Sequence, residues 1–326
     1  MSKIAVIGAG LSGATAGQKL VAAGHGVRLF DKGRGPGGRM STRRVETALG
    51  QVRFDHGAQF FTARSPDFTQ QVATWTRDGA CAPWAGDLVK IDARGQIQPL
   101  GGDTRYVGVG GMSSVVKAAL AALDVKFGAQ VTAIEGVAKA WSLRFSDGAV
   151  EGPFDLILVA VPAEQTAALV GPWVPELAAE ADSVRSAPCW AVMAAFDQPL
   201  KTGFDGAKLE TGPVSWMARE TSKPGRDGPE AWVLHGSPQW SREHLELAPD
   251  EIAQKLIEAL ATHADLPPPI ALSAHRWRYA QIETPVGTGF GLSKDLGLGV
   301  CGDWRLGPRI EFAYRSGAAL AEAVMD

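Results

Sequence analysis

Cysteine is scarce in this chain of 326 residues, and the three that occur, Cys81, Cys189 and Cys301, stand far apart. A disulfide framework needs an even set of cysteines at close spacings, and a structural zinc site needs Cys or His pairs a few residues apart. Neither pattern is present. We therefore expect free thiols, a reducing cytoplasmic compartment and no metal site.

Long apolar runs and runs of like charge are also missing. No stretch approaches the roughly 18 apolar residues of a membrane span, and the apolar segment Ile4 to Ile7 is too short for a signal peptide. The formal net charge is −3, and the densest basic stretch, Arg39 to Arg44, lies within a glycine motif. A nucleic-acid surface needs clustered cations. We expect no membrane and no nucleic-acid partner.

The strongest pattern that is present is Gly8-Ala-Gly10-Leu-Ser-Gly13, between a short apolar strand (Lys3 to Ile7) and a helix pattern (Leu11 to Ala23). The first glycine permits a tight turn, the second lets backbone approach a pyrophosphate, and the third lets the helix pack on the strand. The amino end of the helix faces the phosphates. We expect the ADP half of a dinucleotide to contact Gly8, Gly10, Leu11, Ser12 and Gly13.

An acidic residue follows at the expected distance. Val27 to Phe30 predicts a second parallel strand, and Asp31 closes it 23 residues after Gly8. A carboxylate here accepts hydrogen bonds from the ribose hydroxyls, and Lys32 stands beside it. Asp31 alone fits NAD as well as FAD, so the identity of the dinucleotide depends on the segments that follow.

Two of these segments carry a family resemblance. Gly33-Arg-Gly-Pro-Gly-Gly38-Arg39-Met40 resembles the flavin-binding G-G-R element of the amine oxidase branch of FAD enzymes. Asp55-His-Gly-Ala-Gln-Phe-Phe61 is similar to the segment that runs along the flavin ring in the same enzymes, although we expect at least one of its two phenylalanines in the core. The resemblance implies cofactor contacts from Gly38, Arg39, Met40, His56, Gly57, Ala58, Gln59 and Phe60.

Later segments match the same branch in the same order. Gly110-Gly-Met112 precedes a helix pattern, and Val131 falls where the family places a valine that contacts adenine. Cys301-Gly-Asp303-Trp304 and Gly307-Pro-Arg-Ile-Glu311 precede a last helix, whose positive dipole end would face the flavin N1/O2 edge. The alternatives are an ordinary strand valine and a helix-capping aspartate. The resemblance implies contacts from Gly302, Asp303, Arg309, Ile310 and Glu311.

These matches imply an α/β fold: a Rossmann-type FAD-binding domain of the amine oxidase (GR2) type with an inserted α+β substrate domain. Residues 164–270 differ in composition from the rest of the chain, because they are rich in Trp and are interrupted by Pro/Gly turn signals. We assign 1–65, 101–163 and 271–326 to the FAD-binding domain, and 66–100 together with 164–270 to the substrate domain.

Within this branch the chain most resembles the renalase-like flavoproteins, chiefly their bacterial members. Asp55 to Phe61, Trp216 to Arg226 and His275 to Ala280 carry this narrower resemblance. It implies a hydride taken by FAD from a dihydronicotinamide, an isomer of NAD(P)H, and electrons passed to O2 to give hydrogen peroxide. No cysteine stands close to Arg309, so we expect noncovalent FAD. Such hydride transfer needs alignment more than acid–base catalysis, and no catalytic triad or carboxylate pair is evident.

Alignment needs a polar group at the flavin edge and aromatic side chains beside the substrate ring. Gln59 is the polar candidate, and Trp216 and Trp277 are the aromatic ones. Lys294 is expected at the surface. His235, His244 and His275 lack metal-ligand spacing and are expected in core or capping roles, and Arg219, Lys223, Arg226 and Arg276 are candidates for the pyrophosphate of a dinucleotide substrate.

Glu220 departs from the renalase-like pattern, in which small amide or polar residues are common at this place. A contact between Glu220 and the nicotinamide would argue against that substrate. An amine oxidase of the same fold, or another CH–NH or CH–CH oxidase, stays open as an alternative. A non-enzymatic binding module like the Rab GDP-dissociation inhibitors is disfavoured by the intact glycines, Asp31 and Asp303. A plain NAD-dependent dehydrogenase is disfavoured by Arg39 and Asp303.

Overall fold

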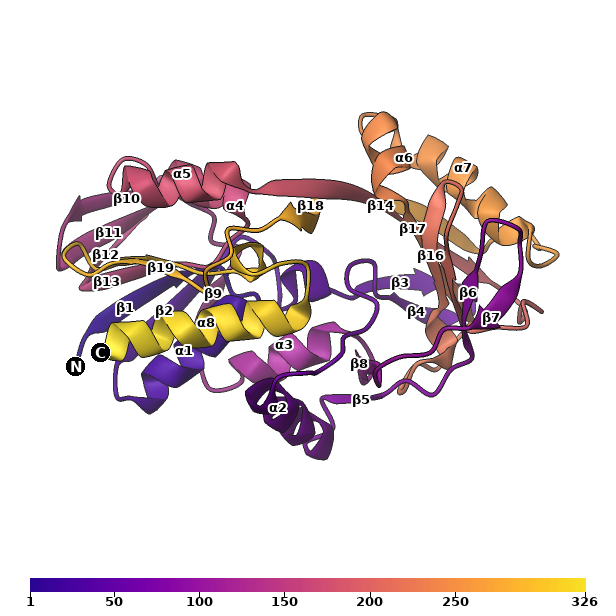
Figure 1. Ribbon diagram of the computed structural model, residues 1–326, viewed down its shortest axis with the longest axis horizontal. Helices are drawn as coiled ribbons and strands as arrows, with labels where there is room; N and C mark the ends of the chain where they lie inside the picture. Colours follow the sequence, from indigo (N-terminus) through magenta and orange to yellow (C-terminus); the bar gives the residue numbers. More distant parts are fainter.

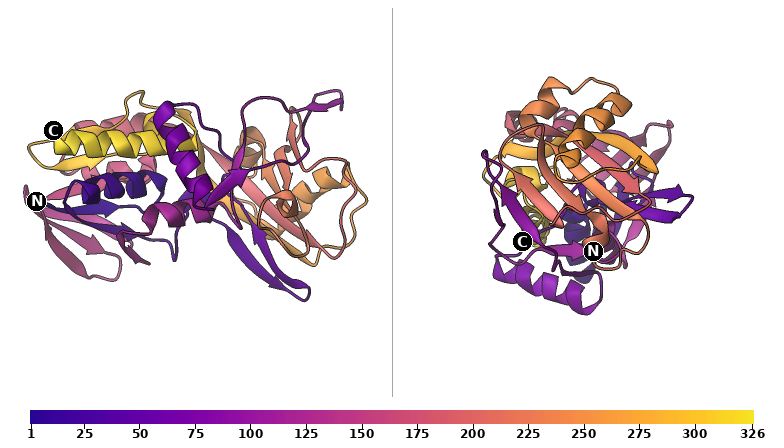
Figure 2. Two further views of the ribbon diagram at one scale, coloured as in Figure 1. Left: turned by 90° about the horizontal axis from the view of Figure 1, so that it is seen from below. Right: turned by 90° about the vertical axis from the view of Figure 1, so that its right-hand side faces the viewer.

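The computed structural model describes residues 1–326 as two halves arranged along the long axis of the molecule (Figure 1 and Figure 2). One half is built on a six-stranded sheet and the other on a seven-stranded sheet. The long strand β14 (Arg185–Phe196) runs from the first half into the second, and both chain termini lie at the outer end of the first half (Figure 1).

The six-stranded sheet of the first half is parallel except at one edge pair. In spatial order its strands are β19 (Gly291–Ser293), β20 (Leu298–Val300), β13 (Leu156–Val159), β1 (Lys3–Ile7), β2 (Gly26–Asp31) and β9 (Asp124–Phe127). The central strands β1, β13 and β20 are short and apolar and are buried on both faces, as parallel strands usually are.

Alternation along β1 divides the core of this half in two. Ile4 and Val6 pack on one face beneath helices, with α8 lying beside α1 (Figure 2). Ala5 and Ile7 pack on the other face against two further helices and a three-stranded meander. The first group is α1 (Leu11–Ala22), α2 (Pro66–Arg77), α3 (Ser113–Leu120) and α8 (Ile310–Met325); the second is α4 (Ala163–Val170), α5 (Pro175–Ser183), β10 (Val131–Val137), β11 (Ala140–Phe145) and β12 (Val150–Phe154).

The seven-stranded sheet of the second half is antiparallel apart from one pair. Val192, Met217 and Leu234 pack on its outer face under two helices, α6 (Pro238–Glu243) and α7 (Pro249–Ala261). The other face is turned toward the first half. In spatial order the strands are β18 (Ala271–Thr284), β14, β17 (Glu230–Gly236), β16 (Val214–Arg219), β15 (Gly206–Leu209), β6 (Leu88–Ile91) and β7 (Ile97–Pro99).

Short elements connect the two sheets. Hairpin β3 (Arg43–Thr47) and β4 (Gly50–Phe54) packs on the inner face of the second half, where Val52 and Phe54 contact Met193 and Val233. The pair β5 (Cys81–Pro83) and β8 (Tyr106–Gly108) leads the chain to the seven-stranded sheet and back. None of the helices combines the length and the hydropathy that a bilayer crossing would need.

The predicted α/β fold is confirmed, but the expected domain boundaries differ from the observed packing. Phe68 and Val72 of α2 and Leu177 of α5 belong to the cores of the first half, because their apolar faces cover its sheet. Strand β18 instead pairs with β14 and extends the second sheet. We propose that α2, α4 and α5 belong to the FAD-binding domain and β18 to the substrate domain.

Four buried charged residues join the two halves. Asp55 follows β4, while Glu220, Lys223 and Arg226 follow β16. Arg226 pairs with both carboxylates, and Lys223 Nζ lies 2.5 Å from Glu220 Oε1 and 3.6 Å from Asp55 Oδ2. We call these four residues the buried quartet.

The quartet is electrically neutral, and its hydrogen bonds are extensive. Asp55 Oδ1 accepts from Met112 N at 2.9 Å and from Thr42 Oγ1 at 2.7 Å, and Glu220 Oε2 accepts from Asp55 N at 3.0 Å. Burial raises the pKa of Asp55, but the charges of Lys223 and Arg226 outweigh burial and hold that pKa below its ordinary value. Because all four are nearly inaccessible to solvent, removal of one partner leaves a buried unpaired charge.

Replacement of Arg226 by Met tests this coupling. Arg226→Met leaves two buried carboxylates with one ammonium group, which is expected to lower the free energy of unfolding by about 3–5 kcal/mol. Urea unfolding followed by tryptophan fluorescence measures it. The matched control is Arg144→Met, which breaks an exposed pair with Glu135 and is expected to cost less than about 1 kcal/mol. Equal effects of the two substitutions would contradict the role given to the quartet.

Candidate active site

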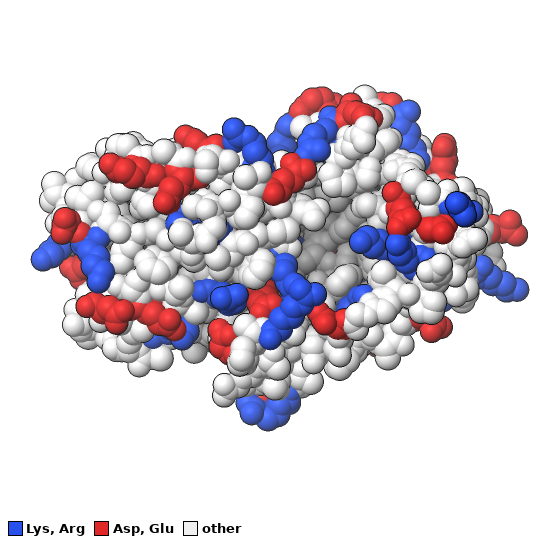
Figure 3. Space-filling model, viewed as in Figure 1, with Lys and Arg blue, Asp and Glu red and all other residues white.

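A cavity of about 780 Å³ lies between the two halves, and Figure 3 shows the molecule hollowed there. Its first wall comes from segments of the first half: the start of α1, the 3-10 turn η1 (Gly38–Met40), residues 56–60 after β4, and Gly302-Asp303. Its second wall comes from strands β14 to β18 of the second half. We call the second wall the substrate wall.

A second cavity of about 360 Å³ lies in the first half, at the ends of β1 and β2. Gly8, Asp31, Lys32 and Val131 line it, and Val161 lines both cavities. The glycine turn therefore stands between a smaller and a larger space. This is the arrangement that a dinucleotide needs, with its adenosine in one space, its pyrophosphate at the turn and its other half in the next space.

The glycine turn leaves room for a ligand. A Cβ on Gly13 would lie 2.0 Å from Gly8 O, so glycine is required there for the helix to pack on the strand, whereas a Cβ on Gly10 would meet no protein atom within 4 Å. Helix α1 begins at Leu11 with no side-chain cap. Its free N–H groups, together with the helix dipole, can bind a phosphate that approaches over Gly10.

Asp31 supports this turn from the end of β2. Its Oδ2 accepts from Ala9 N at 2.7 Å, and its Oδ1 accepts from Gly33 N at 2.7 Å. A carboxylate has four lone-pair positions, so Asp31 retains capacity for ribose hydroxyls in the smaller cavity. The predicted role of Asp31 agrees with this position.

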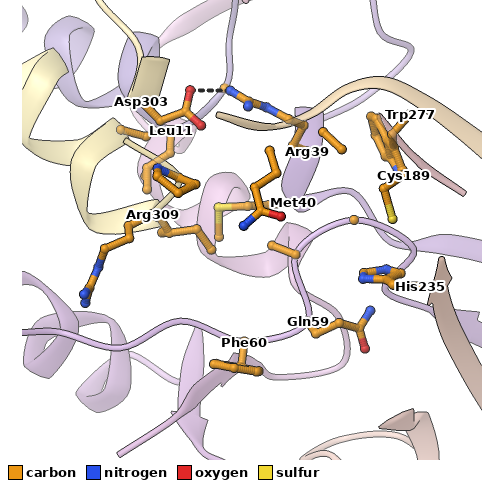
Figure 4. A pocket seen from close by; sticks show the side chains of 18 of the residues that line it. Leu11, Arg39, Met40, Gln59, Phe60, Cys189, His235, Trp277, Asp303 and Arg309 are labelled. Carbon is orange, nitrogen blue, oxygen red and sulfur yellow. Dashed lines mark hydrogen bonds and ion pairs between the residues drawn. The ribbon is translucent and has the colours of Figure 1, made fainter. Parts of the chain in front are cut away.

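Residues from opposite ends of the chain meet at the larger cavity. Arg39 forms an ion pair with Asp303, drawn as a dashed line in Figure 4. Trp304 beside it is fully buried, and its Nε1 donates to Val161 O at 3.1 Å. Helix α8 begins at Ile310, again without a side-chain cap. The Gly302-Asp303 segment is thus fixed next to the G-G-R element, and the uncapped amino end of α8 lies beside the cavity.

One buried polar atom provides an independent test of the fit to FAD. Glu164, in the first turn of α4, lines the smaller cavity, and its Oε2 is buried without a hydrogen-bond partner. An unsatisfied buried carboxylate oxygen is costly. The adenosine of FAD carries suitable donors, namely the adenine amino group and the ribose hydroxyls. Gly10, Asp31 and Glu164 therefore all fit the ADP half of FAD.

The substrate wall is assembled by strand register. Lys208 faces Trp216 across β15 and β16, Trp216 faces His235 across β16 and β17, and Cys189 faces Trp277 across β14 and β18. Directly opposed residues share one face of a sheet. One row of side chains therefore looks across the cavity toward the flavin-binding segments.

Aromatic contacts tie this wall to the segment after β4. The Phe60 ring centroid lies 5.3 Å from that of Trp216, and His56 stacks on Trp277 with centroids 5.2 Å apart. Trp277 Nε1 also donates to His56 O at 2.9 Å. The cavity is therefore lined with flat rings from both halves.

Three titratable groups that line the cavity, His56, His235 and Cys189, are uncharged at neutral pH. Burial, with the charge of Arg43 and the proximity of His275, lowers the pKa of His56 to about 3. Burial lowers the pKa of His235 to about 4 and raises that of the Cys189 thiol to about 12. His235 Nε2 has no hydrogen-bond partner, and the ring is a neutral polar group opposite Trp216 in the strand register.

Gln59 is held by the buried quartet. Its Oε1 accepts from Lys223 Nζ at 3.2 Å, and its Nε2 donates to the backbone oxygen of Asp55. Figure 4 shows Gln59 and His235 on the same side of the cavity. The quartet therefore fixes the side-chain amide of Gln59, the residue that we predicted at the flavin edge.

Most of the predicted site residues line one of the two cavities. In the larger cavity, Phe60 lies in the wall, whereas Phe61 is buried and stacks on Tyr106, as expected for one of the pair. The larger cavity is lined by Gly10, Leu11, Ser12, Arg39, Met40, His56, Gly57, Ala58, Gln59, Phe60, Trp216, Trp277, Gly302, Asp303, Arg309 and Ile310, and the smaller by Gly8, Asp31, Lys32 and Val131.

Three predicted cofactor residues line neither cavity. Gly13 packs α1 on the sheet, and Gly38 has φ +54°, a conformation suited to glycine at the start of η1. Glu311 is buried and accepts from Ser65 N at 2.7 Å, with Arg309 3.3 Å away. Its carboxylate is thus used within the protein, and a direct contact from Glu311 to FAD is not supported.

The expected pyrophosphate cations are also elsewhere. Lys223 and Arg226 belong to the buried quartet, and Arg219 lies 3.2 Å from Glu230. Arg276 binds Leu245 O and Glu246. None of the four lines the larger cavity. Each instead binds a carboxylate or carbonyl group elsewhere in the protein, and the sequence alone does not show which groups become neighbours in the fold. Glu220 is likewise buried and does not line the cavity. It therefore does not contact a substrate there, and its departure from the renalase-like pattern does not argue against a nicotinamide.

Glu164 was missed by sequence reasoning, and its role can be tested by flavin binding. Glu164→Ala is expected to weaken binding of FAD to the apoprotein about tenfold, since it removes a charged hydrogen-bond acceptor. FMN lacks the adenosine, so its affinity is expected to stay unchanged. Quenching of flavin fluorescence measures both constants. Glu176→Ala, an exposed residue in the first turn of α5, is the control. Equal losses for FAD and FMN would refute a contact with adenosine.

The chain matches two known protein families. Residues 82–325 match the family of flavin containing amine oxidoreductases, and residues 6–74 match the NAD(P)-binding Rossmann-like domain. Renalase of Mus musculus is 26% identical over 306 residues, which cover 88% of this chain and 87% of that protein.

Solved structures of low sequence identity share the fold. Putrescine oxidase bound to putrescine gives a TM-score of 0.74 at 15% identity, with 99% of each chain covered. Reduced UDP-galactopyranose mutase gives 0.76 at 13% identity, covering 100% of this chain and 96% of the other. With a family match over residues 82–325, the chain belongs to the flavin-containing amine oxidoreductases and is a renalase-like, FAD-dependent enzyme.

Proposed function

We propose that this enzyme oxidises a dihydronicotinamide, an isomer of NAD(P)H, and reduces O2 to hydrogen peroxide. The dihydronicotinamide, O2 and one proton would give the nicotinamide cation and H2O2. Bound FAD supplies the redox chemistry, since a flavin accepts a hydride and returns two electrons to oxygen. The partners are thus one small-molecule substrate and O2. Three free cysteines support the proposal that the enzyme works in a reducing cytoplasm.

The observation that carries this proposal is the character of the rings and histidines that line the larger cavity. Trp216, Trp277 and Phe60 present flat apolar surfaces, while the polar groups beside them, His56 and His235, are neutral at physiological pH. Aromatic side chains orient a planar ring by stacking. Oxidation of a dihydropyridine produces an aromatic ring, and this aromatisation drives the hydride transfer. The main requirement on the protein is therefore to align the substrate ring with the flavin.

The same cavity is poorly suited to an amine substrate. An aliphatic amine is protonated at neutral pH and is attracted by a free carboxylate. The only acidic residue that lines the cavity is Asp303, and it is paired with Arg39. The neutral histidines have pKa values too low for an effective general base. These features favour a dihydronicotinamide over an amine, and the renalase of mouse as a relative supports the same choice.

Anaerobic reduction of the flavin tests the proposal. A partly isomerised NADH preparation is expected to bleach the flavin absorbance of the holoenzyme within seconds, whereas putrescine, cyclohexylamine and other amines leave it unchanged. Admission of air is expected to restore the oxidised spectrum with stoichiometric H2O2. Bleaching by amines alone would assign the chain to amine oxidation, and a purified protein that takes up no FAD would favour a binding module.

The pH profile tests whether the two cavity histidines stay neutral. The pKa values of His56 and His235 lie at about 3 and about 4, so both rings stay neutral until the pH falls toward those values. The limiting rate of flavin reduction is expected to change less than about twofold between about pH 5.5 and pH 8. Stopped-flow absorbance at several pH values measures it. A bell-shaped profile centred near neutrality would show that a titrating base takes part.

A further inference from the structure

Two positively charged side chains that line the larger cavity lack a carboxylate partner. Lys208 lies on β15, and Arg105 lies immediately before β8. We propose that Arg105 and Lys208 form a subsite for the phosphate groups of the substrate. The inference rests on the proposed function and adds which residues bind the phosphates of the dinucleotide substrate.

Arg105 is fixed in place by neutral groups. Its Nη2 donates to Leu100 O at 2.9 Å and to Gly101 O at 2.7 Å, and its guanidinium lies over the Phe60 ring, 5.4 Å from the centroid. Its Nε is buried and has no partner. The nearby acid Asp103 pairs with Arg64 instead. The charge of Arg105 is therefore held at the cavity without an ion pair.

Lys208 is free for a different reason. Its neighbour across the strand pair β6–β15 is Lys90, and Lys90 pairs with Glu210, the acid closest in sequence. The Lys208 side chain forms neither a hydrogen bond nor an ion pair, and it shares a face with Trp216. A flexible exposed ammonium group of this kind can reach a phosphate at the cavity mouth.

The two cations are linked by aromatic rings. The Arg105 guanidinium lies over the Phe60 ring, whose centroid is 5.3 Å from that of Trp216. Trp216 in turn lies opposite Lys208 in the strand register. The wall thus offers ring surfaces flanked by positive charge. A nucleotide has the matching combination of planar rings and phosphates. The other lining cations, Arg39 and Arg309, are paired with Asp303 and Glu311.

Lys208 stands on the side opposite the expected pyrophosphate site of FAD. That site is the amino end of α1 with Gly10 and Leu11, in the first half, whereas Lys208 lies on the seven-stranded sheet. The subsite is therefore available to a second, exchangeable ligand. Uncompensated positive charge next to a cavity also raises the local concentration of anions, which would speed capture of a phosphorylated substrate.

A charge ladder of substrates tests the subsite. The riboside, mononucleotide and dinucleotide of one dihydronicotinamide isomer share the reacting ring and differ in phosphate content. Lys208→Met and Arg105→Met are each expected to raise the apparent Kd for the mononucleotide and dinucleotide about tenfold, equivalent to about 1.4 kcal/mol. The riboside Kd and the limiting rate of flavin reduction are expected to stay within about twofold of the wild-type values.

Controls separate the subsite from general charge and from loss of structure. Lys201→Met removes an exposed lysine of the second half that does not line the cavity, and no effect is expected. Lys208→Glu should weaken nucleotide binding more than Lys208→Met. Raising the salt concentration should weaken dinucleotide binding to the wild type more than to the double variant.

Titration with oxidised NAD+, followed through the flavin absorbance of the holoenzyme, measures binding without hydride transfer. Weaker NAD+ binding in both variants, with the Lys201→Met protein unaffected, supports the subsite even if no dihydronicotinamide reduces the flavin. Unchanged NAD+ and nucleotide affinities in both variants overturn the subsite, while rapid reduction by the riboside would leave the proposed function intact.

Discussion

Arg226 bridges Asp55 and Glu220 across the boundary between the two halves, with Lys223 completing a neutral, fully buried set of charges. The geometry of the cavity depends on this quartet. It joins the segment after β4 to the segment after β16, and it holds the Gln59 amide through Lys223. A buried ion pair contributes little net stability relative to apolar packing, but it strongly penalises separation of its partners. The quartet therefore acts chiefly by fixing the positions of these two segments relative to each other.

The two sides of the cavity are built by different physical means. On the flavin side, backbone groups and helix ends predominate, and one ion pair, between Arg39 and Asp303, joins motifs from the two ends of the chain. On the substrate side, side chains predominate, and their order follows from the register of β14 to β18. A backbone site is tolerant of sequence change, while a side-chain wall can be altered one residue at a time. A common FAD site can thus serve different substrates in one family.

Much of the flavin side was predictable from the sequence because its signals are local. A glycine turn between a strand and a helix, followed by Asp31 at the end of the next strand, specifies backbone shape by short-range sterics. The predicted positions of Gly8, Gly10, Asp31 and Val131 agree with the two cavities. Glu311 did not agree, since its carboxylate is used by Ser65 N, a partner 246 residues away.

The sequence by itself determined the fold class, the dinucleotide crevice and the resemblance to flavin enzymes, because spacing and small residues are sufficient to specify them. Only the tertiary structure decided which charges are free. Lys223 and Arg226 look like ligands for phosphate in the sequence but neutralise Asp55 and Glu220, whereas Arg105 and Lys208 carry no signal and yet remain unpaired at the cavity. The reason is physical: the partner of a charge is fixed by distance in space, and residues 55 and 226 become neighbours only when the two halves pack together.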